Sequence, residues 1–155
     1  MDLNLTQCLA IELMNKHNLL ASGWKFQFDR ARRRFGLCHY GTKTISLSAH
    51  LVSLNDEARV RNTILHEIAH ALVGFKHHHD AVWKAKAIEI GCDGERCYSA
   101  KEVTRPEAKY IMVCPNGHSF TKHKRTKRKT SCAKCSPIYD ERYALVCKLN
   151  PKFGK

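Results

Sequence analysis

The segment HEIAH, residues 66 to 70, places two histidines four positions apart, with a glutamate directly after the first. On an α-helix such positions share one face, so His66 and His70 can direct their imidazoles at one metal ion. A zinc ion held in this way keeps an open position for water and lowers the pKa of that water towards about 7. Glu67 then lies beside the metal, where its carboxylate can act as a general base. This arrangement is typical of zinc peptidases.

The residues around this segment predict the helix that positions it. Apolar residues recur every four positions and form a stripe on one face of that helix. The stripe consists of Val60, Ile64, Ile68 and Leu72. Asn55 or Asp56 can cap the start of the helix, and Gly74 can end it.

A catalytic zinc usually has a third protein ligand, and spacing leaves several candidates open. The metzincin pattern is disfavoured, because its glycine and histidine positions hold Val73 and Lys76. A thermolysin-like site takes a glutamate from a later helix, for which only Glu89 is available. The three histidines at 77–79 follow the expected end of the helix, where the chain can fold back over the metal. One of these three is therefore the expected ligand.

The C-terminal third contains a second set of metal-ligand types. Cys114, His118, Cys132 and Cys135 form two short pairs separated by thirteen residues. This spacing suits a structural zinc ribbon with three thiolates and one imidazole, and His123 is the alternative fourth ligand. The remaining thiols are interpreted as structural or free, and they are Cys8, Cys38, Cys92, Cys97 and Cys147.

The positive charge is concentrated in the same region, because residues 99–155 supply +10 of the net +13. The run KHKRTKRK lies between the two ligand pairs and is expected to form an exposed loop or hairpin tip. We predict that its cations contact nucleic-acid phosphates. They are Lys122, Lys124, Arg125, Lys127, Arg128 and Lys129. Tyr110, Phe120 and Tyr139 either stack on bases or pack the small ribbon core.

The N-terminal part predicts a helix followed by a small sheet. Leu9, Leu13 and Leu20 mark a packing helix that ends near Gly23. The runs WKFQF and TISLS alternate as two strands of a sheet with one buried face. The basic cluster RARRRFG, residues 30–36, lies between them, so its arginines are expected at a strand edge or turn. There they serve solubility or extend a track for DNA.

Composition limits the class of protein. With 155 residues, of which 43% are hydrophobic, the chain can bury one modest core and support an appendage. No apolar run approaches the roughly 18 residues of a membrane span, and the start lacks the layout of a signal peptide. We therefore expect a soluble intracellular monomer, cytoplasmic or associated with DNA in the nucleoid. In that compartment cysteines are metal ligands or free thiols.

A longer pattern resembles a known family. The segment TISLSAHLVSLNDEARVRNTILHEIAHAL, followed by a histidine, an aromatic residue four positions later and then lysine, is similar to the SprT-like zinc metallopeptidases, which include the Spartan proteases. The resemblance covers about residues 5–148. It implies that the third ligand is the histidine four residues before Trp83, which is His79, with His78 as the runner-up. Asp80 stands where the family usually has glycine and can cap the next helix. Relatives often carry a zinc ribbon with four cysteines, so His118 is a departure.

The expected fold is α+β. Residues 1–107 form a small zincin-like metallopeptidase domain, with helices, a short β-sheet and the HExxH helix, and residues 108–155 form a basic zinc ribbon. The join falls near SAKEVTRPEAK, where Pro106 interrupts the periodicity. Two zinc ions are expected, one catalytic and one structural.

Our first hypothesis is a zinc endopeptidase that acts on proteins at DNA. Zinc on His66, His70 and His79 would activate the water, and Glu67 would take its proton and pass it to the leaving amine. A DNA-binding ribbon would confine the protease to proteins on DNA by raising their effective concentration. The resemblance to Spartan implies that the substrates are proteins crosslinked to DNA.

Two other hypotheses keep the metal sites. The chain could be a non-proteolytic, zinc-containing DNA-binding or regulatory protein, or a hydrolase of non-protein substrates, which gives the basic ribbon no evident task. Glu67 distinguishes the protease hypothesis from the hypothesis of a non-proteolytic DNA-binding protein. A Glu67→Gln variant should keep zinc and DNA affinity under both, and lose proteolysis only if the chain is a protease.

Overall fold

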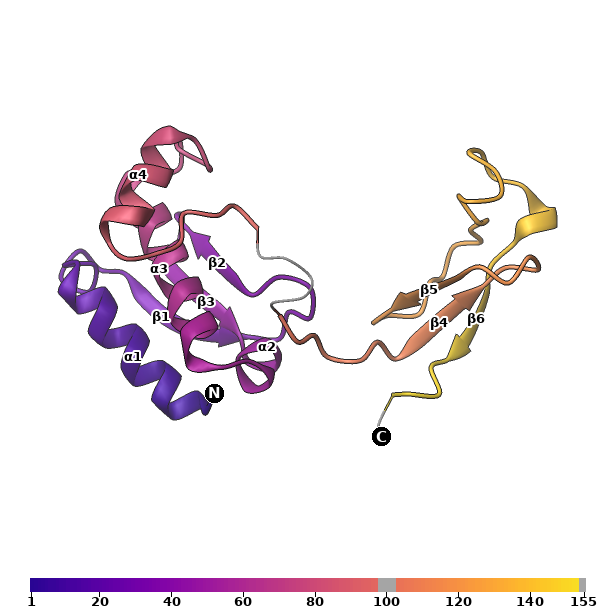
Figure 1. Cartoon of the computed structure of the whole chain (residues 1–155), viewed down its shortest axis with the longest axis horizontal. Coiled ribbons are helices and arrows are strands. Elements are labelled where there is room, and N and C mark those ends of the chain that lie inside the picture. The colour runs from indigo at the N-terminus through magenta and orange to yellow at the C-terminus, as the bar shows by residue number, and fades with distance from the viewer. Residues whose placement is uncertain (98–102, 154–155) are drawn as a thin grey trace. The chain divides into compact units, whose positions relative to one another are not determined.

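The computed structural model describes residues 1–97 and 103–153. The chain forms two compact units, Met1–Pro106 and Glu107–Lys155, whereas the sequence places the boundary between residues 107 and 108. Together they make a small α+β protein with two small sheets (Figure 1). Within the described ranges, no helix combines the length and the apolar character needed to cross a membrane.

The first unit contains a three-stranded sheet in the order β1-β3-β2. Its strands are β1 (Lys25–Asp29), β2 (Gly36–His39) and β3 (Thr44–Ser48). The central strand β3 runs parallel to β1 and antiparallel to β2. The sequence predicts β1 and β3 but not β2, because four residues beginning with glycine show too little alternation to be recognised.

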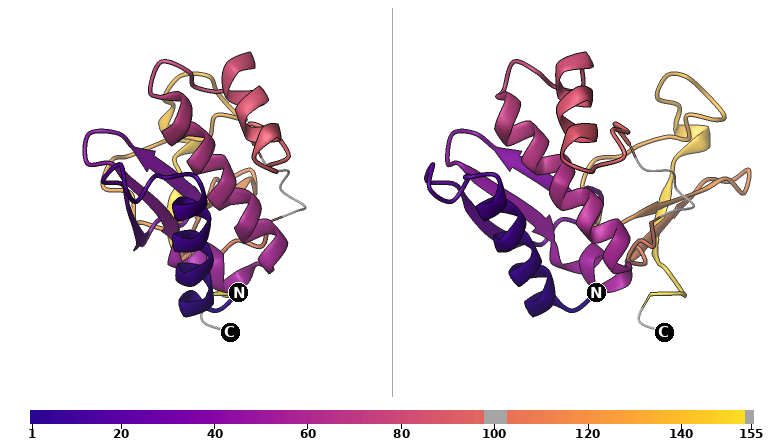
Figure 2. Two further views of the ribbon diagram at one scale, coloured as in Figure 1. Left: turned by 90° about the vertical axis from the view of Figure 1, so that its left-hand side faces the viewer. Right: turned by 60° about the vertical axis from the view of Figure 1, so that its left-hand side comes forward.

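Helices cover this sheet and supply most of the core. They are α1 (Leu3–Lys16), α2 (Ala49–Leu54), α3 (Glu57–Val73) and α4 (Ala81–Glu89). α1 and α3 lie side by side against the sheet, and α4 packs against α3 (Figures 1 and 2). Ile45 and Leu47 of β3 are fully buried in one cluster with Leu13 of α1 and Ile64 of α3. The sheet therefore fixes the position of α3.

The first helix is shorter than predicted, since it ends at Lys16 and not near Gly23. Asn18 adopts a left-handed φ of 56°. The N–H of Leu19 then donates to the carbonyl of Met14 at 2.9 Å, and that of Asn18 donates to Asn15 at 2.9 Å. These two bonds form a Schellman motif, which ends a helix and which asparagine tolerates.

Helix α3 begins and ends as its sequence predicts. Asp56, one of two predicted caps, accepts a hydrogen bond from the N–H of Arg59 at 2.8 Å. Gly74 follows the last turn with a φ of 84°. The predicted stripe faces the core at Val60, Ile64 and Ile68, whereas Leu72 in the last turn is 37% exposed.

The second unit is a small antiparallel sheet in the order β5-β4-β6 with long loops. Its elements are β4 (Tyr110–Val113), β5 (Ser119–Lys122), the short 3-10 helix η1 (Glu141–Tyr143) and β6 (Val146–Leu149). Among the described residues of this unit, the buried hydrophobic side chains are Ala108, Met112, Cys114 and Cys132. Such a core is too small to fold a chain by hydrophobic burial alone, so this unit needs another source of stability.

Candidate functional site

Three histidine nitrogens converge at the C-terminal end of α3. His66 and His70 lie one turn apart on the helix, and His79 comes from the loop before α4. The Nε2 atom of His79 lies 3.1 Å from the Nε2 atoms of both His66 and His70. A tetrahedral zinc with Zn–N bonds of about 2.0–2.1 Å separates its ligand nitrogens by about 3.3 Å. The three rings therefore fit a single zinc ion.

The neighbouring histidines do not belong to this group. His77 pairs with Asp80, with 2.8 Å between its Nδ1 and the carboxylate Oδ2. His78, the runner-up ligand, lines the same cavity as His79 but is not among the converging nitrogens. Glu89, the thermolysin-type candidate, is bound to Lys86 at the end of α4. The structure thus brings together the three histidines that the resemblance implies.

Two backbone groups orient the rings. The backbone of Glu95 lies close to the ring of His66 and that of His77 close to the ring of His70, and each raises the pKa of its ring, as a carbonyl that accepts from a ring N–H does. Because Nε2 of each ring faces the cluster, the donor is the other ring nitrogen. Such a bond fixes the tautomer that leaves the Nε2 lone pair for a metal.

The rings of His66 and His70 are also held in the neutral form that binds a metal. Burial lowers the pKa of His66 to about 4, and the neighbouring His79 adds to the effect. Burial likewise lowers the pKa of His70 to about 4, followed by the effects of His66 and His79. Both rings are therefore uncharged at pH 7.

Trp83 forms the floor of the histidine cluster. Its ring centroid lies 4.6 Å from those of His66 and His79 and 5.1 Å from that of His70, on which it stacks. Asp80 caps α4, as predicted, by accepting a hydrogen bond from the N–H of Trp83 at 3.0 Å. The first turn of α4 therefore places both the loop ligand and the ring beneath it.

We expect the substitution Trp83→Ala to lower the free energy of unfolding of the first unit by about 3–5 kcal/mol, because it empties a site that is 1% exposed. Urea unfolding followed by far-UV circular dichroism would measure this change. The matched variant Trp83→Phe keeps an aromatic ring and should lose less. Equal stability of the alanine variant and the wild type would contradict this role of Trp83.

Glu67 lines the same cavity as the three histidines and is only 7% exposed. Burial raises its pKa to about 8, whereas Arg34 and the backbone N–H of Cys38 act in the opposite direction. A cation bound by the histidines would also favour the ionised carboxylate. Strand β2 approaches so closely that a Cβ on Gly36 would meet Oε1 of Glu67. The carboxylate is therefore confined beside the expected metal.

The histidines and Glu67 open into a cavity of about 540 Å³ within the first unit. Strand β2, α3 and the loop after α4 supply its walls. The cluster at 30–36, which was expected at a strand edge or turn, contributes Arg33 and Arg34 to this lining. Arg34 also pairs with Asp29 at 2.6 Å. Together with the histidine cluster, these residues form one cavity that combines a candidate metal site, a buried carboxylate and basic side chains.

Four ligand atoms converge in the second unit. They belong to Cys114, His118, Cys132 and Cys135. Nδ1 of His118 lies 3.6, 3.6 and 3.3 Å from Sγ of Cys114, Cys132 and Cys135, and Sγ of Cys114 lies 4.0 Å from Sγ of Cys135. Tetrahedral zinc gives separations of about 3.6 Å between N and S and about 3.8 Å between two S atoms. The group therefore fits zinc, which thiolates favour, and its histidine is His118 and not the alternative His123.

We expect Cys132→Ser to unfold the second unit and leave the first unit folded. Cys132 is fully buried and is both a ligand and a core residue of this unit. Loss of one thiolate removes most of the metal-binding free energy that folds such a unit. Loss of dispersed amide signals from residues 107–155 in an NMR spectrum would measure it. The exposed Cys8→Ser variant is the control, and a dispersed spectrum for Cys132→Ser would contradict the prediction.

A model of the SprT-like family matches residues 7–104. The chain belongs to the SprT-like family. A search of curated proteins found no match to the chain. The SprT-like match contains His66, Glu67, His70 and His79 and ends before the four-ligand group. The family is associated with metallopeptidase-like domains, in agreement with the three-histidine group of the first unit.

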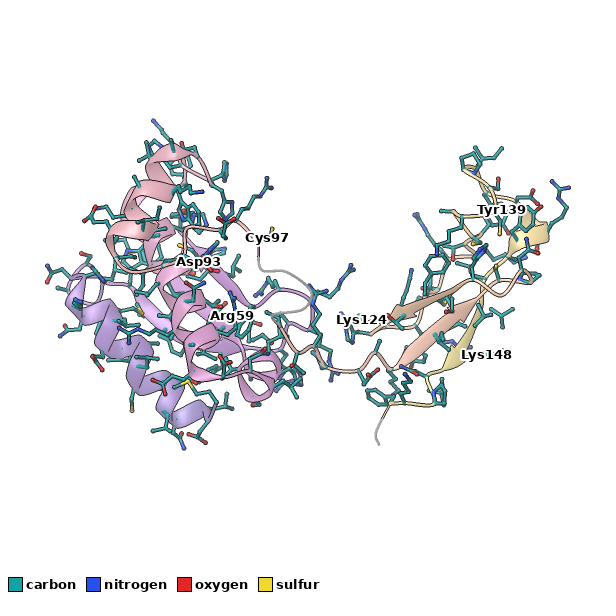
Figure 3. The ribbon with its side chains drawn as sticks, in the orientation of Figure 1. Arg59, Asp93, Cys97, Lys124, Tyr139 and Lys148 are labelled. Atoms are coloured by element: carbon teal, nitrogen blue, oxygen red, sulfur yellow. The ribbon has the colours of Figure 1, made fainter. Side chains whose placement is uncertain are left out.

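In this SprT-like chain the predicted nucleic-acid contacts are all exposed. Lys122 ends β5, and the other five lie in the loop of residues 123–130. Lys124 follows one edge strand of the small sheet, and Lys148 lies on the opposite edge strand, β6 (Figure 3). Tyr139 is half-exposed and donates a hydrogen bond to Glu141 at 3.1 Å. Contact with nucleic acid is still a prediction.

Proposed function

We propose that the chain is a zinc-dependent endopeptidase that cleaves DNA-associated or DNA-crosslinked proteins and is held on DNA by its basic zinc ribbon. One observation carries the catalytic part of this proposal. The buried Glu67 and three histidines whose nitrogens fit one zinc ion line the same cavity. This is the set of groups that metal-assisted hydrolysis of an amide requires.

Each residue has a defined role in the proposed reaction. His66, His70 and His79 hold the zinc, which when bound would supply Lewis-acid polarisation of the scissile carbonyl and of the attacking water. Glu67 accepts the proton of that water as the new C–O bond forms, and delivers it to the amine nitrogen as the C–N bond breaks. Strand β2, which lies against the side chain of Glu67 at Gly36, confines the carboxylate for both transfers.

The basic ribbon supports localisation on DNA. Residues 99–155 carry a net charge of +10, and six cations lie exposed within eight residues. Cations of this density bind the phosphate backbone with an affinity that falls steeply as salt rises. Binding of enzyme and substrate to one DNA molecule raises their effective concentration. Cleavage would then be directed to proteins on DNA.

The alternative is a non-proteolytic, zinc-containing DNA-binding or regulatory protein. The charge of the second unit favours it, because DNA binding needs no hydrolysis. This alternative gives no task to Glu67, whose carboxylate is buried next to the histidines at a cost in desolvation. We therefore prefer the protease.

Cleavage of a basic DNA-binding protein by the purified chain tests the proposal, with and without single-stranded DNA, at low and at moderate salt. We expect cleavage that DNA stimulates, that salt weakens and that a zinc chelator abolishes. A variant with Lys127, Arg128 and Lys129 replaced by glutamine should lose the stimulation. The control replaces Lys16, Lys25 and Arg61 of the first unit, which removes the same charge. A chain that carries zinc and binds DNA but cleaves nothing would favour the alternative.

A further inference from the structure

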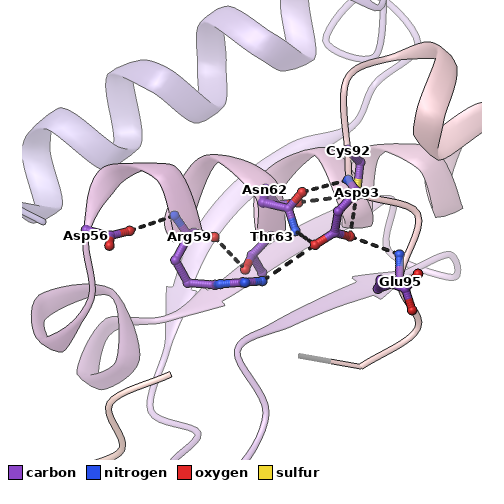
Figure 4. A network of polar contacts seen from close by, with 7 residues as sticks. All are labelled: Asp56, Arg59, Asn62, Thr63, Cys92, Asp93 and Glu95. Atoms are coloured by element: carbon purple, nitrogen blue, oxygen red, sulfur yellow. Dashed lines mark hydrogen bonds and ion pairs between the residues drawn. The ribbon is translucent and has the colours of Figure 1, made fainter. Parts of the chain in front are cut away.

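The loop that follows α4, residues 91–97, is fastened to α3 by a reciprocal pair of hydrogen bonds (Figure 4). The side-chain amide of Asn62 donates through Nδ2 to Oδ2 of Asp93 at 2.8 Å. The backbone N–H of Asp93 donates back to Oδ1 of Asn62 at 2.9 Å. We call this pair the Asn62–Asp93 clasp. It joins residues that lie 31 positions apart in the sequence.

The carboxylate of Asp93 also organises the loop itself. Its Oδ1 accepts a hydrogen bond from the N–H of Glu95 at 2.9 Å, and its Oδ2 lies 3.9 Å from Nη1 of Arg59 (Figure 4). Gly94, which lies between Asp93 and Glu95 in the sequence, has a φ of 70°, a conformation that favours glycine. The clasp therefore determines where the backbone of Glu95 lies relative to α3.

That backbone in turn reaches the metal site. Asn62 and His66 are four residues apart on α3 and share one face of the helix. The backbone of Glu95 lies close to the ring of His66, and His66, Asp93 and Glu95 line the same cavity. The helix thus fastens the loop at Asn62, and the loop orients the ring of His66 one turn further on. Neither Asn62 nor Asp93 is among the converging ligand atoms.

We propose that Asn62 and Asp93 are positioning residues for the metal ligand His66. The clasp holds the backbone of Glu95 beside the ring of His66 in the wall of one cavity and so favours the orientation and tautomer that present Nε2 to the metal. This inference rests on the three-histidine metal site of the proposed function. Partners of this kind typically contribute about 10- to 100-fold to metal affinity.

The substitution Asn62→Asp separates positioning from simple electrostatics. It replaces the donor Nδ2 by an oxygen and places two carboxylates opposite each other, so the clasp opens. An added negative charge near a bound cation would by itself tighten metal binding. Loss of positioning loosens it. The two explanations therefore predict changes of opposite sign in metal affinity.

The exchange of the two side chains provides a rescue. In the double variant Asn62→Asp/Asp93→Asn, the new amide at 93 donates to the new carboxylate at 62, which still accepts the backbone N–H of residue 93. The amide oxygen at 93 still accepts the N–H of Glu95. The two hydrogen bonds donated by backbone N–H groups keep their direction, and the bond between the two side chains is reversed. The double variant should therefore behave as the wild type does.

Titration of the metal-free full-length chain with cobalt(II) tests the proposal, because the thiolates of the ribbon give charge-transfer absorption that the histidine site lacks. We expect Asn62→Asp to raise the cobalt dissociation constant of the histidine site by about 10- to 100-fold and to leave the ribbon unchanged. The double variant should return to within about threefold of the wild type. Asn4→Asp, which adds the same charge to the exposed first turn of α1, is the matched control.

Every outcome decides between the explanations. If Asn62→Asp tightens cobalt binding or leaves it unchanged, or if the folded double variant stays weak, the proposal is overturned. If Asn62→Asp does not fold, Asn62→Ala replaces it, since it removes both hydrogen-bonding atoms of residue 62 without changing the charge, and weaker cobalt binding then comes from loss of the clasp. If cobalt binds the wild-type histidine site and the variants do not change its affinity, the role of the clasp is refuted but the metal site is not. Absence of binding to the wild-type histidine site refutes the proposed function first.

Discussion

Replacement of Glu67 by glutamine is expected to lower the rate of peptide cleavage by about 10²- to 10⁴-fold, the usual contribution of a general acid–base group. The amide has nearly the same shape as the carboxylate but does not accept a proton at neutral pH. Its oxygen can still accept the backbone N–H of Cys38. The three histidines are untouched, so zinc content and DNA affinity should not change.

The measurement pairs the cleavage rate with the zinc content of each protein. Glu89→Gln is the matched control, since it removes an exposed carboxylate from α4 that takes no part in the histidine group. This control also tests the thermolysin-type ligand that spacing leaves open. Cleavage by Glu67→Gln at close to the wild-type rate would exclude Glu67 as the general base. Loss of zinc from that variant would instead assign it a structural role.

The parts of the site that sequence predicts are those that local signals encode. Helix α3 has a cap at Asp56, a glycine after its last turn and an apolar stripe, so its bounds follow from neighbouring residues. The pair His66 and His70 then shares a face by helix geometry alone. The three ribbon cysteines are similarly predictable, whereas the sequence leaves the fourth ligand open between His118 and His123, and the structure brings His118 into the group.

Local spacing does not predict which histidine is the third metal ligand. Spacing leaves His77, His78 and His79 equivalent, and only the resemblance to SprT-like proteins selects the last. The structure gives a physical reason for this choice. Asp80 caps α4 directly after His79 and pairs with the side chain of His77, and of the two remaining histidines it is His79 whose nitrogen converges with those of His66 and His70.

The contacts that sequence does not predict join distant segments. Asn62 and Asp93 belong to no recognised motif, and Arg33 and Arg34 look like ordinary surface charge until the fold places them in the cavity. The sequence does not predict strand β2, because four residues are too few to show a strand pattern. An isolated glycine in a strand does signal a close approach of another group, but it does not say which group approaches.

Gly36 is the residue of β2 that lies against the side chain of Glu67. We expect Gly36→Ala to lower the cleavage rate by about 10- to 100-fold. A Cβ at this position would lie 2.5 Å from Oε1 of Glu67 and 2.8 Å from its Cγ. These separations are too short, so the carboxylate or the strand must move. The histidines are not involved, so cobalt affinity should be close to that of the wild type.

Gly41→Ala is the matched control for this substitution. Its Cβ would lie 3.5 Å from the ring of His39, an ordinary contact, and it has the same effect on the unfolded chain. We expect the control to cleave at the wild-type rate. Equal rates for the two alanine variants would show that the space in front of Glu67 is not needed.

The double variant Gly36→Ala/Glu67→Gln shows whether the alanine acts through Glu67. If the alanine acts only by displacing the general base, it cannot lower the cleavage rate of a chain that already lacks this base. The double variant should then cleave at the rate of Glu67→Gln alone. If the alanine instead distorts β2 as a surface that binds substrate, the two losses should multiply. The cycle therefore separates a residue that leaves space for the catalytic carboxylate from one that only maintains the strand.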